Sequence, residues 1–129
     1  MFPKLADFGL ARTSVQSNDC LTFCGTPQYL APEIIATQKG EEAGHCHCGY
    51  GRQADMWSVG VVLYNMISGD SPFFEDRMYD QILNGHLNLT DDTWDGVTFE
   101  AKELVYQFMH ANLENRLTSQ RTLGHEWSI

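Results

Sequence analysis

The stretch from Gln53 to Ser68 limits the possible folds of this chain more than any other segment. Its apolar residues cover nearly the whole circumference of a helix; they are Met56, Trp57, Val59, Val61, Val62, Leu63, Tyr64, Met66 and Ile67. A helix that is apolar all round is stable only where other elements cover it, and Gly69 follows where such a helix would end. We therefore predict a buried central helix over residues 53–68, with other elements packed around it.

The rest of the sequence predicts a mainly α-helical protein. Further helices are expected over residues 31–36, 76–84, 99–110 and 118–124. Pro32 falls in the first turn of the first of these, where its missing N–H is not needed, and Thr98 can cap the third. Residues 4–6 are expected to be extended, and residues 39–51 to form a glycine-rich loop.

Composition and charge narrow the class of partner. The 129 residues suffice for one domain, and a hydrophobic content of 43% argues against a disordered chain. The net charge is −9, of which −7 falls between Asp70 and Glu103. Such a chain repels nucleic acids and anionic membranes, so we expect neither as a partner. The acidic stretch is either a solvated face or a surface that favours basic protein substrates.

The sequence also predicts an intracellular location. Met1 is followed by neither a charged nor an apolar leader segment, and the apolar run over residues 56–67 is too short to cross a bilayer. We expect a soluble protein of the nucleus or cytoplasm. Its four cysteines are then expected to be reduced thiols.

Several short motifs follow one another in a fixed order. They are Asp7-Phe8-Gly9, Cys24-Gly25-Thr26-Pro27, Ala31-Pro32-Glu33, Asp55-Met56-Trp57, Ser71-Pro72-Phe73-Phe74, Asn115-Arg116-Leu117-Thr118 and His125-Glu126-Trp127. In this order, from about Lys4 to the end, the chain resembles the eukaryotic protein kinase family. The run from Thr22 to Ile35 is similar to serine/threonine kinases, and most of all to the calmodulin-dependent-kinase-like group. Within that group the likeness points to checkpoint kinases that carry a forkhead-associated domain.

The resemblance implies a protein kinase domain that is only partly present. Residues 1–129 would run from the Asp-Phe-Gly motif to the end of a kinase-like C-terminal lobe, built around the buried central helix and without the N-terminal lobe. The whole kinase would transfer phosphate from ATP, with Mg²⁺, to serine or threonine of protein or peptide substrates. No tightly bound cofactor is expected on this chain itself.

The resemblance also assigns a nucleotide site. Asp7 would coordinate the magnesium ions that bridge the ATP phosphates, Phe8 would pack inside the protein, and Gly9 would let the backbone turn sharply. The alternative for Asp7 is an ordinary turn residue ahead of Gly9.

A second set of residues would belong to the activation segment. Thr26 lies in the expected substrate-docking loop, and Thr22 stands where an activating phosphate is often found. Arg12 would help to hold that phosphate through charge pairing. The alternative is that Thr22 is one of several solvated hydroxyl groups.

The remaining assigned residues would be structural. Glu33 and Arg116 would form a buried ion pair, whose members stabilise the fold only together. Asp55 would accept backbone hydrogen bonds from the catalytic loop, and Trp57 would pack beside it.

Three functional readings remain open at this point. The first is a piece of a kinase that is inactive by itself, because the 129 residues include no phosphate-binding glycine loop, no strand lysine and no catalytic loop. The second is a catalytically dead lobe that binds partners; in both, uncovered apolar surface would favour self-association. The third is a zinc module at residues 45–48, but four consecutive donors cannot all reach one ion, so a surface loop without zinc is expected there.

Overall fold

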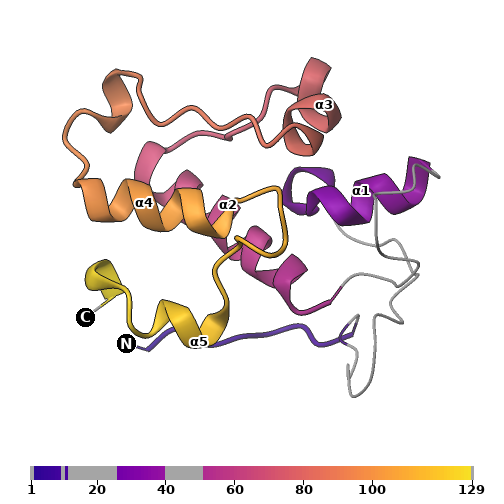
Figure 1. Ribbon diagram of the computed structural model, residues 1–129, viewed down its shortest axis with the longest axis horizontal. Coiled ribbons are helices and arrows are strands. Elements are labelled where there is room, and N and C mark those ends of the chain that lie inside the picture. The colour runs from indigo at the N-terminus through magenta and orange to yellow at the C-terminus, as the bar shows by residue number, and fades with distance from the viewer. Residues whose placement is uncertain (1, 10, 12–25, 40–50, 129) are drawn as a thin grey trace.

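A computed structural model describes residues 2–9, 11, 26–39 and 51–128, and in these ranges all regular structure is helical (Figure 1). The α-helices are α1 (Pro32–Lys39), α2 (Gln53–Ser68), α3 (Met78–Leu83), α4 (Phe99–Phe108) and α5 (Ser119–Thr122). The single-turn 3-10 helices are η1 (Pro27–Tyr29), η2 (Glu75–Arg77), η3 (Asp92–Trp94) and η4 (Glu126–Ser128). The prediction of a mainly helical protein is confirmed for the described part of the chain.

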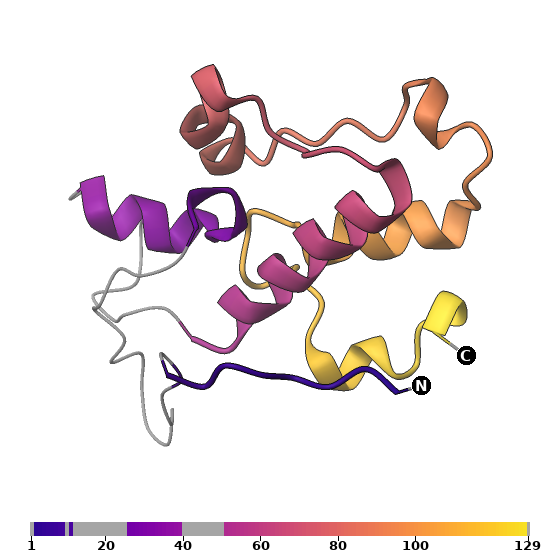
Figure 2. The same cartoon turned by 180° about the vertical axis from the view of Figure 1, so that it is seen from behind.

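Helix α2 is the element around which the others are arranged. It contacts both α4 and η1, while α1 packs against α3 (Figures 1 and 2). Its buried face presents Trp57, Val61 and Tyr64 to the core. The predicted bounds are confirmed, because Gly69 ends the helix in the left-handed region with φ of 77°.

The prediction that α2 is buried on all sides, in contrast, is wrong for this chain. Val59, Val62 and Met66 are 47%, 46% and 77% exposed. They are spaced by three and four residues, so they form one stripe along the helix. No described element packs over this stripe, which is the physical reason for its exposure.

Helices α2 and α4 cross in close contact at Gly60. A Cβ atom at this position would lie 2.6 Å from Met109 Cγ and 2.7 Å from Phe108 Cβ. Both distances are too short for carbon atoms, so only glycine allows the two helices to approach this far.

Replacing Gly60 with alanine is expected to lower the free energy of unfolding by about 1–3 kcal/mol, because the added methyl group forces α2 and α4 apart. This loss outweighs the better helix propensity of alanine, which is about 0.5–1 kcal/mol. Urea unfolding followed by tryptophan fluorescence measures the change. Gly96→Ala is the control, since a Cβ at Gly96 meets no atom within 4 Å. Equal stability of the two variants would contradict the close crossing.

The other helix boundaries differ from the predictions for local reasons. Helix α1 runs three residues beyond residue 36, and the segment 76–84 divides into η2 and α3 because Arg77 leaves the helical region at φ −129°. Helix α4 starts as predicted, with the Thr98 hydroxyl accepting a hydrogen bond from the Ala101 N–H, but it ends at Phe108. Residues 4–6 pair with no strand in the described ranges.

Tyr64 ties the C-terminal half of α2 to the following segment. Its hydroxyl donates to the Asn88 carbonyl at 3.0 Å, and its ring packs against Trp94 with centroids 4.9 Å apart. Burial raises the pKa of the Tyr64 phenol; the Trp94 side chain opposes this effect, and the carboxylates of Asp91 and Asp70 add to it.

This raised pKa predicts a loss of stability in alkali. Below a pH of about 10 the Tyr64 phenol is neutral in both the folded and the unfolded chain, so its full contribution to the free energy of unfolding is present. Above that pH the unfolded chain loses the proton first, and stability falls as the pH rises through the folded pKa. We expect Tyr64→Phe to flatten this fall above about pH 10 in urea unfolding. Tyr79→Phe, at an exposed tyrosine, should keep the parent slope; parallel slopes for all three proteins would refute the assignment.

Candidate functional site

Arg116 bonds to three other parts of the chain. It is fully buried, and its guanidinium donates to both carboxylate oxygens of Glu33, at 2.7 and 2.9 Å. The same group donates to the backbone carbonyls of Gln53 and His110, each at 2.9 Å. The structure thus brings the two predicted partners, Glu33 and Arg116, into a bidentate ion pair. Together with the bond to the Gln53 carbonyl, this pair links the start of α1 to the start of α2.

Trp57 completes this cluster from the side of α2. Its ring lies 5.2 Å from Cζ of Arg116, within the range of a cation–π contact. Phe73 stacks parallel to it, with centroids 6.2 Å apart and an interplanar angle of 4°. Trp57 therefore packs against Arg116 and Phe73, and we call Glu33, Trp57, Phe73 and Arg116 the arginine cluster.

The segment ahead of α1 is held on α2 by a second contact. The Ser58 hydroxyl donates to the Tyr29 carbonyl at 2.9 Å, and the Leu30 N–H donates to the Pro27 carbonyl at 3.1 Å. These bonds fix η1 in place directly after Thr26. Thr26 itself is exposed, and its side chain caps no helix. Its side chain is therefore open to a molecule approaching from outside.

Residues 2–9 are exposed and run along one margin of the molecule (Figure 2). Asp7 has φ of 80°, in the left-handed region that few residues other than glycine, asparagine and aspartate adopt. A turn follows, closed by the Ala11 N–H donating to the Phe8 carbonyl at 3.0 Å. The interpretation of Phe8 as an interior residue is wrong for this chain. Its side chain is 67% exposed because no described element lies over it.

Asp55 is exposed in the first turn of α2. Among the described residues, no backbone N–H donates to its carboxylate. A carboxylate in the first turn of a helix is stabilised by the helix dipole, and this is the interaction that its position provides. The role predicted for Asp55 with a catalytic loop stays a prediction.

Three further predictions concern residues outside the described ranges. Arg12, Thr22 and the His45–Cys48 run all fall there, so the structure does not place them. Within the described ranges, no three His, Cys, Asp or Glu side chains come together as a metal site. No described helix is long and apolar enough to cross a membrane.

Comparison with known proteins identifies the family. The family model described as the protein kinase domain matches residues 1–128. The chain belongs to the protein kinase family. It is 39% identical over 127 residues to a probable serine/threonine-protein kinase of Dictyostelium discoideum, fhkE, and 40% identical over 129 residues to the serine/threonine-protein kinase DCLK2 of Homo sapiens. Calcium-dependent protein kinase 25 of Arabidopsis thaliana is 35% identical over 127 residues.

Each of these kinases is much longer than the matched region. The matches cover 96% of this chain but only 17%, 15% and 22% of fhkE, DCLK2 and the Arabidopsis kinase. Both fhkE and DCLK2 are named as serine/threonine-protein kinases. This agrees with the likeness of the segment around Thr26 and Pro27 to serine/threonine kinases. The calcium-dependent relative is consistent with a place in the calmodulin-dependent-kinase-like group.

The sequence interpretation of this kinase chain missed two residues that build the site. Ser58 holds η1 on α2, and Gln53 donates from Nε2 to the Leu113 carbonyl at 2.9 Å, in addition to its carbonyl contact with Arg116. The polar side chain of Ser58 within an apolar-rich segment was the feature that could have identified it, since a half-buried hydroxyl needs a hydrogen-bond partner.

Proposed function

We propose that this chain supplies the activation segment and the substrate-docking part of an ATP-dependent serine/threonine protein kinase that phosphorylates proteins. One observation carries the proposal. The arginine cluster and Ser58 fix the segment 26–33 to α2, while Thr26 remains exposed at its edge. A rigidly held loop with an open hydroxyl residue can orient a peptide substrate, and phosphoryl transfer depends on such positioning.

The residues present fit one part of a nucleotide site. The Asp7 carboxylate is exposed and has no ion pair with any described residue. A hard oxygen donor of this kind suits Mg²⁺, which takes one or two carboxylates together with substrate phosphates. When bound, Mg²⁺ and ATP supply the phosphoryl group and the positive charge that neutralises its transfer. In this chain, Asp7 would hold the metal, and Gly9 would turn the backbone toward the loop that follows.

The finer features belong to the same proposal. The described helices would form the C-terminal lobe of the kinase domain around α2. Thr22 would carry an activating phosphate that Arg12 helps to hold. Basic protein substrates would suit the charge of −9, and the nucleus or cytoplasm would provide the ATP.

A complementation assay tests the proposal. The chain is assayed with radiolabelled ATP and a basic serine peptide, alone and co-expressed with the preceding part of the DCLK2 kinase domain. We expect background signal from the chain alone, and turnover once the glycine loop, strand lysine and catalytic loop are supplied. A complex that forms but transfers no phosphate would contradict the enzyme assignment. Specific turnover by the chain alone would contradict its predicted inactivity.

A second candidate function, a partner-binding lobe without catalysis, is favoured by the apolar stripe Val59–Val62–Met66 on α2. Such a stripe is most stable when another molecule covers it, so we expect the chain alone to self-associate. Sedimentation velocity should show species larger than a monomer, and Val62→Lys with Met66→Lys should shift them to monomer. Phe99→Lys, at another exposed apolar residue, is the control and should leave the distribution unchanged. A monomeric parent chain would rule out this use of the stripe.

A further inference from the structure

Helix α3 ends at an asparagine that a glycine follows. Asn84 is exposed at the end of the helix, and Gly85 lies in the left-handed region with φ of 61°. The Gly85 N–H donates to the Ile82 carbonyl at 3.1 Å. The His86 N–H donates to the Gln81 carbonyl at 2.8 Å. These two bonds form a Schellman ending, which fixes the backbone on both sides of the Asn84–Gly85 peptide bond.

An asparagine that precedes glycine can react with its own backbone. After the Gly85 N–H loses its proton to hydroxide, the nitrogen forms a bond to Cγ of Asn84, and the bond from Cγ to Nδ2 breaks. The amide leaves as ammonia, with a proton from water. Water then opens the cyclic imide at either carbonyl group, which gives aspartate or isoaspartate at position 84 without any change of oxidation state. Glycine favours this attack because it has no Cβ and lets the backbone turn freely.

The folded chain holds both reacting groups in other bonds. Nδ2 of Asn84 donates to the Asp80 carbonyl at 2.7 Å, so the side chain is held back along α3. The Asn84 backbone N–H donates to the same carbonyl at 3.0 Å. The proton that must leave Gly85 is donated to Ile82. The reaction therefore requires molecules in which the end of α3 has opened.

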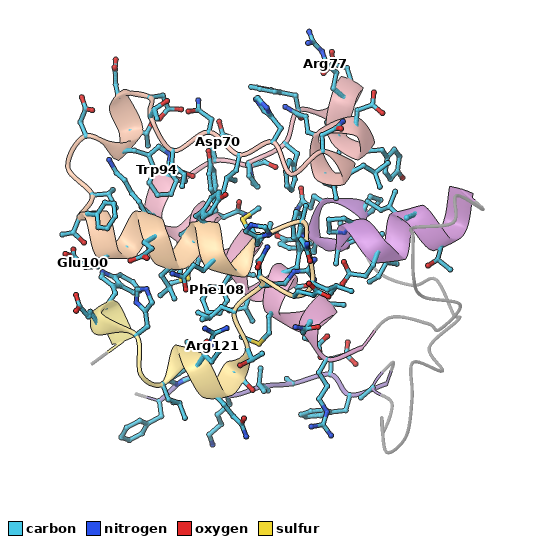
Figure 3. All side chains as sticks on the ribbon, viewed as in Figure 1. Asp70, Arg77, Trp94, Glu100, Phe108 and Arg121 are labelled. Atoms are coloured by element: carbon cyan, nitrogen blue, oxygen red, sulfur yellow. The ribbon has the colours of Figure 1, made fainter. Side chains whose placement is uncertain are left out.

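Helix α3 is an element in which such opening is expected. It has six residues, of which Ile82 alone is buried. Arg77, directly ahead of α3, points away from the body of the molecule, so this helix lies at the margin of the fold (Figure 3). Short elements with few buried side chains open at a lower free energy than the core. The Ile82 side chain is thus the main anchor that keeps the reacting groups apart.

Isoaspartate does not fit the folded backbone at this position. A Cβ on Gly85 would lie 2.9 Å from Cβ of Ala111, so the glycine already approaches its neighbour closely. Isoaspartate adds one carbon atom to the backbone just ahead of this glycine, which either presses it on Ala111 or breaks the Schellman ending. The Ala111 carbonyl accepts from the Arg116 guanidinium at 3.5 Å, so the disturbance reaches the arginine cluster.

We propose that Asn84–Gly85 is a deamidation site that folded α3 protects, and that conversion to isoaspartate prevents the end of α3 from forming again. The site is separate from Asp7 and Thr26. Each opening of α3 exposes the site to conversion, and conversion keeps the helix end open, so the change runs in one direction. Because α1 packs against α3, it loosens the half of the molecule that holds the expected substrate-docking loop.

Mass spectrometry of proteolytic peptides from the full 129-residue chain measures the conversion, with the aspartate and isoaspartate products separated by chromatography. The chain is incubated in mildly alkaline buffer, folded or unfolded in urea, beside a free peptide of residues 78–90. We expect the unfolded chain and the peptide to convert at the same rate, and the folded chain at least about tenfold more slowly. Asn84→Gln, whose amide is one carbon farther from the backbone, should show no conversion at this position.

Two core variants test whether the opening is local to α3. Ile82→Val shortens the fully buried anchor and should speed conversion of the folded chain about two- to tenfold. Val105→Ala, at a fully buried residue of α4, is the control and should keep the parent rate. The proposal is overturned if the free peptide does not convert, if the folded chain converts as fast as the peptide, or if both variants speed conversion equally.

The consequence of conversion is tested on the product itself. Chains that carry isoaspartate should be cut by protease within residues 78–90 faster than the Asn84→Asp variant, because only isoaspartate lengthens the backbone. Equal cutting of the two proteins would overturn the claim that conversion keeps α3 open. No nucleotide is present in these experiments, so their outcomes are independent of the proposed kinase function.

Discussion

Replacing Arg116 with methionine is expected to lower the free energy of unfolding by about 3–5 kcal/mol, the usual cost of removing one partner of a buried ion pair. The Glu33 carboxylate would then be left without its bidentate donor, while its side chain remains mostly buried. The carbonyls of Gln53 and His110 would each lose a hydrogen bond from the same group. A loss of this size is a large part of the whole stability of a domain.

Urea unfolding measures the effect, with tryptophan fluorescence as the probe because Trp57 lies against the guanidinium. Arg77→Met is the matched control, since its ion pair with Asp76 spans 3.6 Å between side chains that are 77% and 73% exposed. Exposed ion pairs contribute about 1 kcal/mol or less to the free energy of unfolding. If Arg116→Met costs no more than Arg77→Met, the arginine cluster does not hold α1 on α2. Limited proteolysis of the two variants gives a second comparison where the unfolding transition is broad.

The parts of the fold that could be predicted are those specified by short-range pattern. The apolar-rich run over residues 53–68 and the following glycine define α2, because helical periodicity and the left-handed end position are local properties. The N-cap of α4 could also be predicted, because Thr98 lies directly before the helix that it caps. The Glu33–Arg116 contact joins residues 83 positions apart, and only the resemblance to kinases could link them.

The parts that could not be predicted depend on what lies nearby in space. Glycine at position 60 looks unfavourable within a helix, and only the approach of Met109 and Phe108 explains it. The burial assigned to Phe8 failed because the resemblance carried over a family environment that no described residue of this chain provides. The division of residues 76–84 at Arg77 likewise reflects a backbone change that helix propensity does not record.

Replacing Asp7 with asparagine is expected to reduce kcat of the complemented kinase about a thousandfold or more. The amide keeps the shape of the side chain but removes the negative charge that holds a divalent cation. A catalytic metal ion contributes several kcal/mol of charge stabilisation in the transition state, and each 1.36 kcal/mol corresponds to a factor of ten in rate. Turnover of a basic serine peptide, measured over a range of Mg²⁺ concentrations, gives kcat and KM separately. We expect the loss to appear in kcat and the KM for the peptide to change little, because the docking segment around Thr26 is untouched.

Asparagine is also the substitution least able to disturb the structure at this position. Asp7 has φ of 80°, and asparagine is one of the few non-glycine residues that adopt positive φ readily. The side chain is exposed, so the fold should melt at the parent temperature. Asp95→Asn, at an exposed carboxylate beyond η3, is the control for the loss of one negative charge and should keep parent turnover. Turnover of Asp7→Asn within tenfold of the Asp95→Asn control would show that Asp7 is a turn residue and that the metal is held by other groups of the kinase.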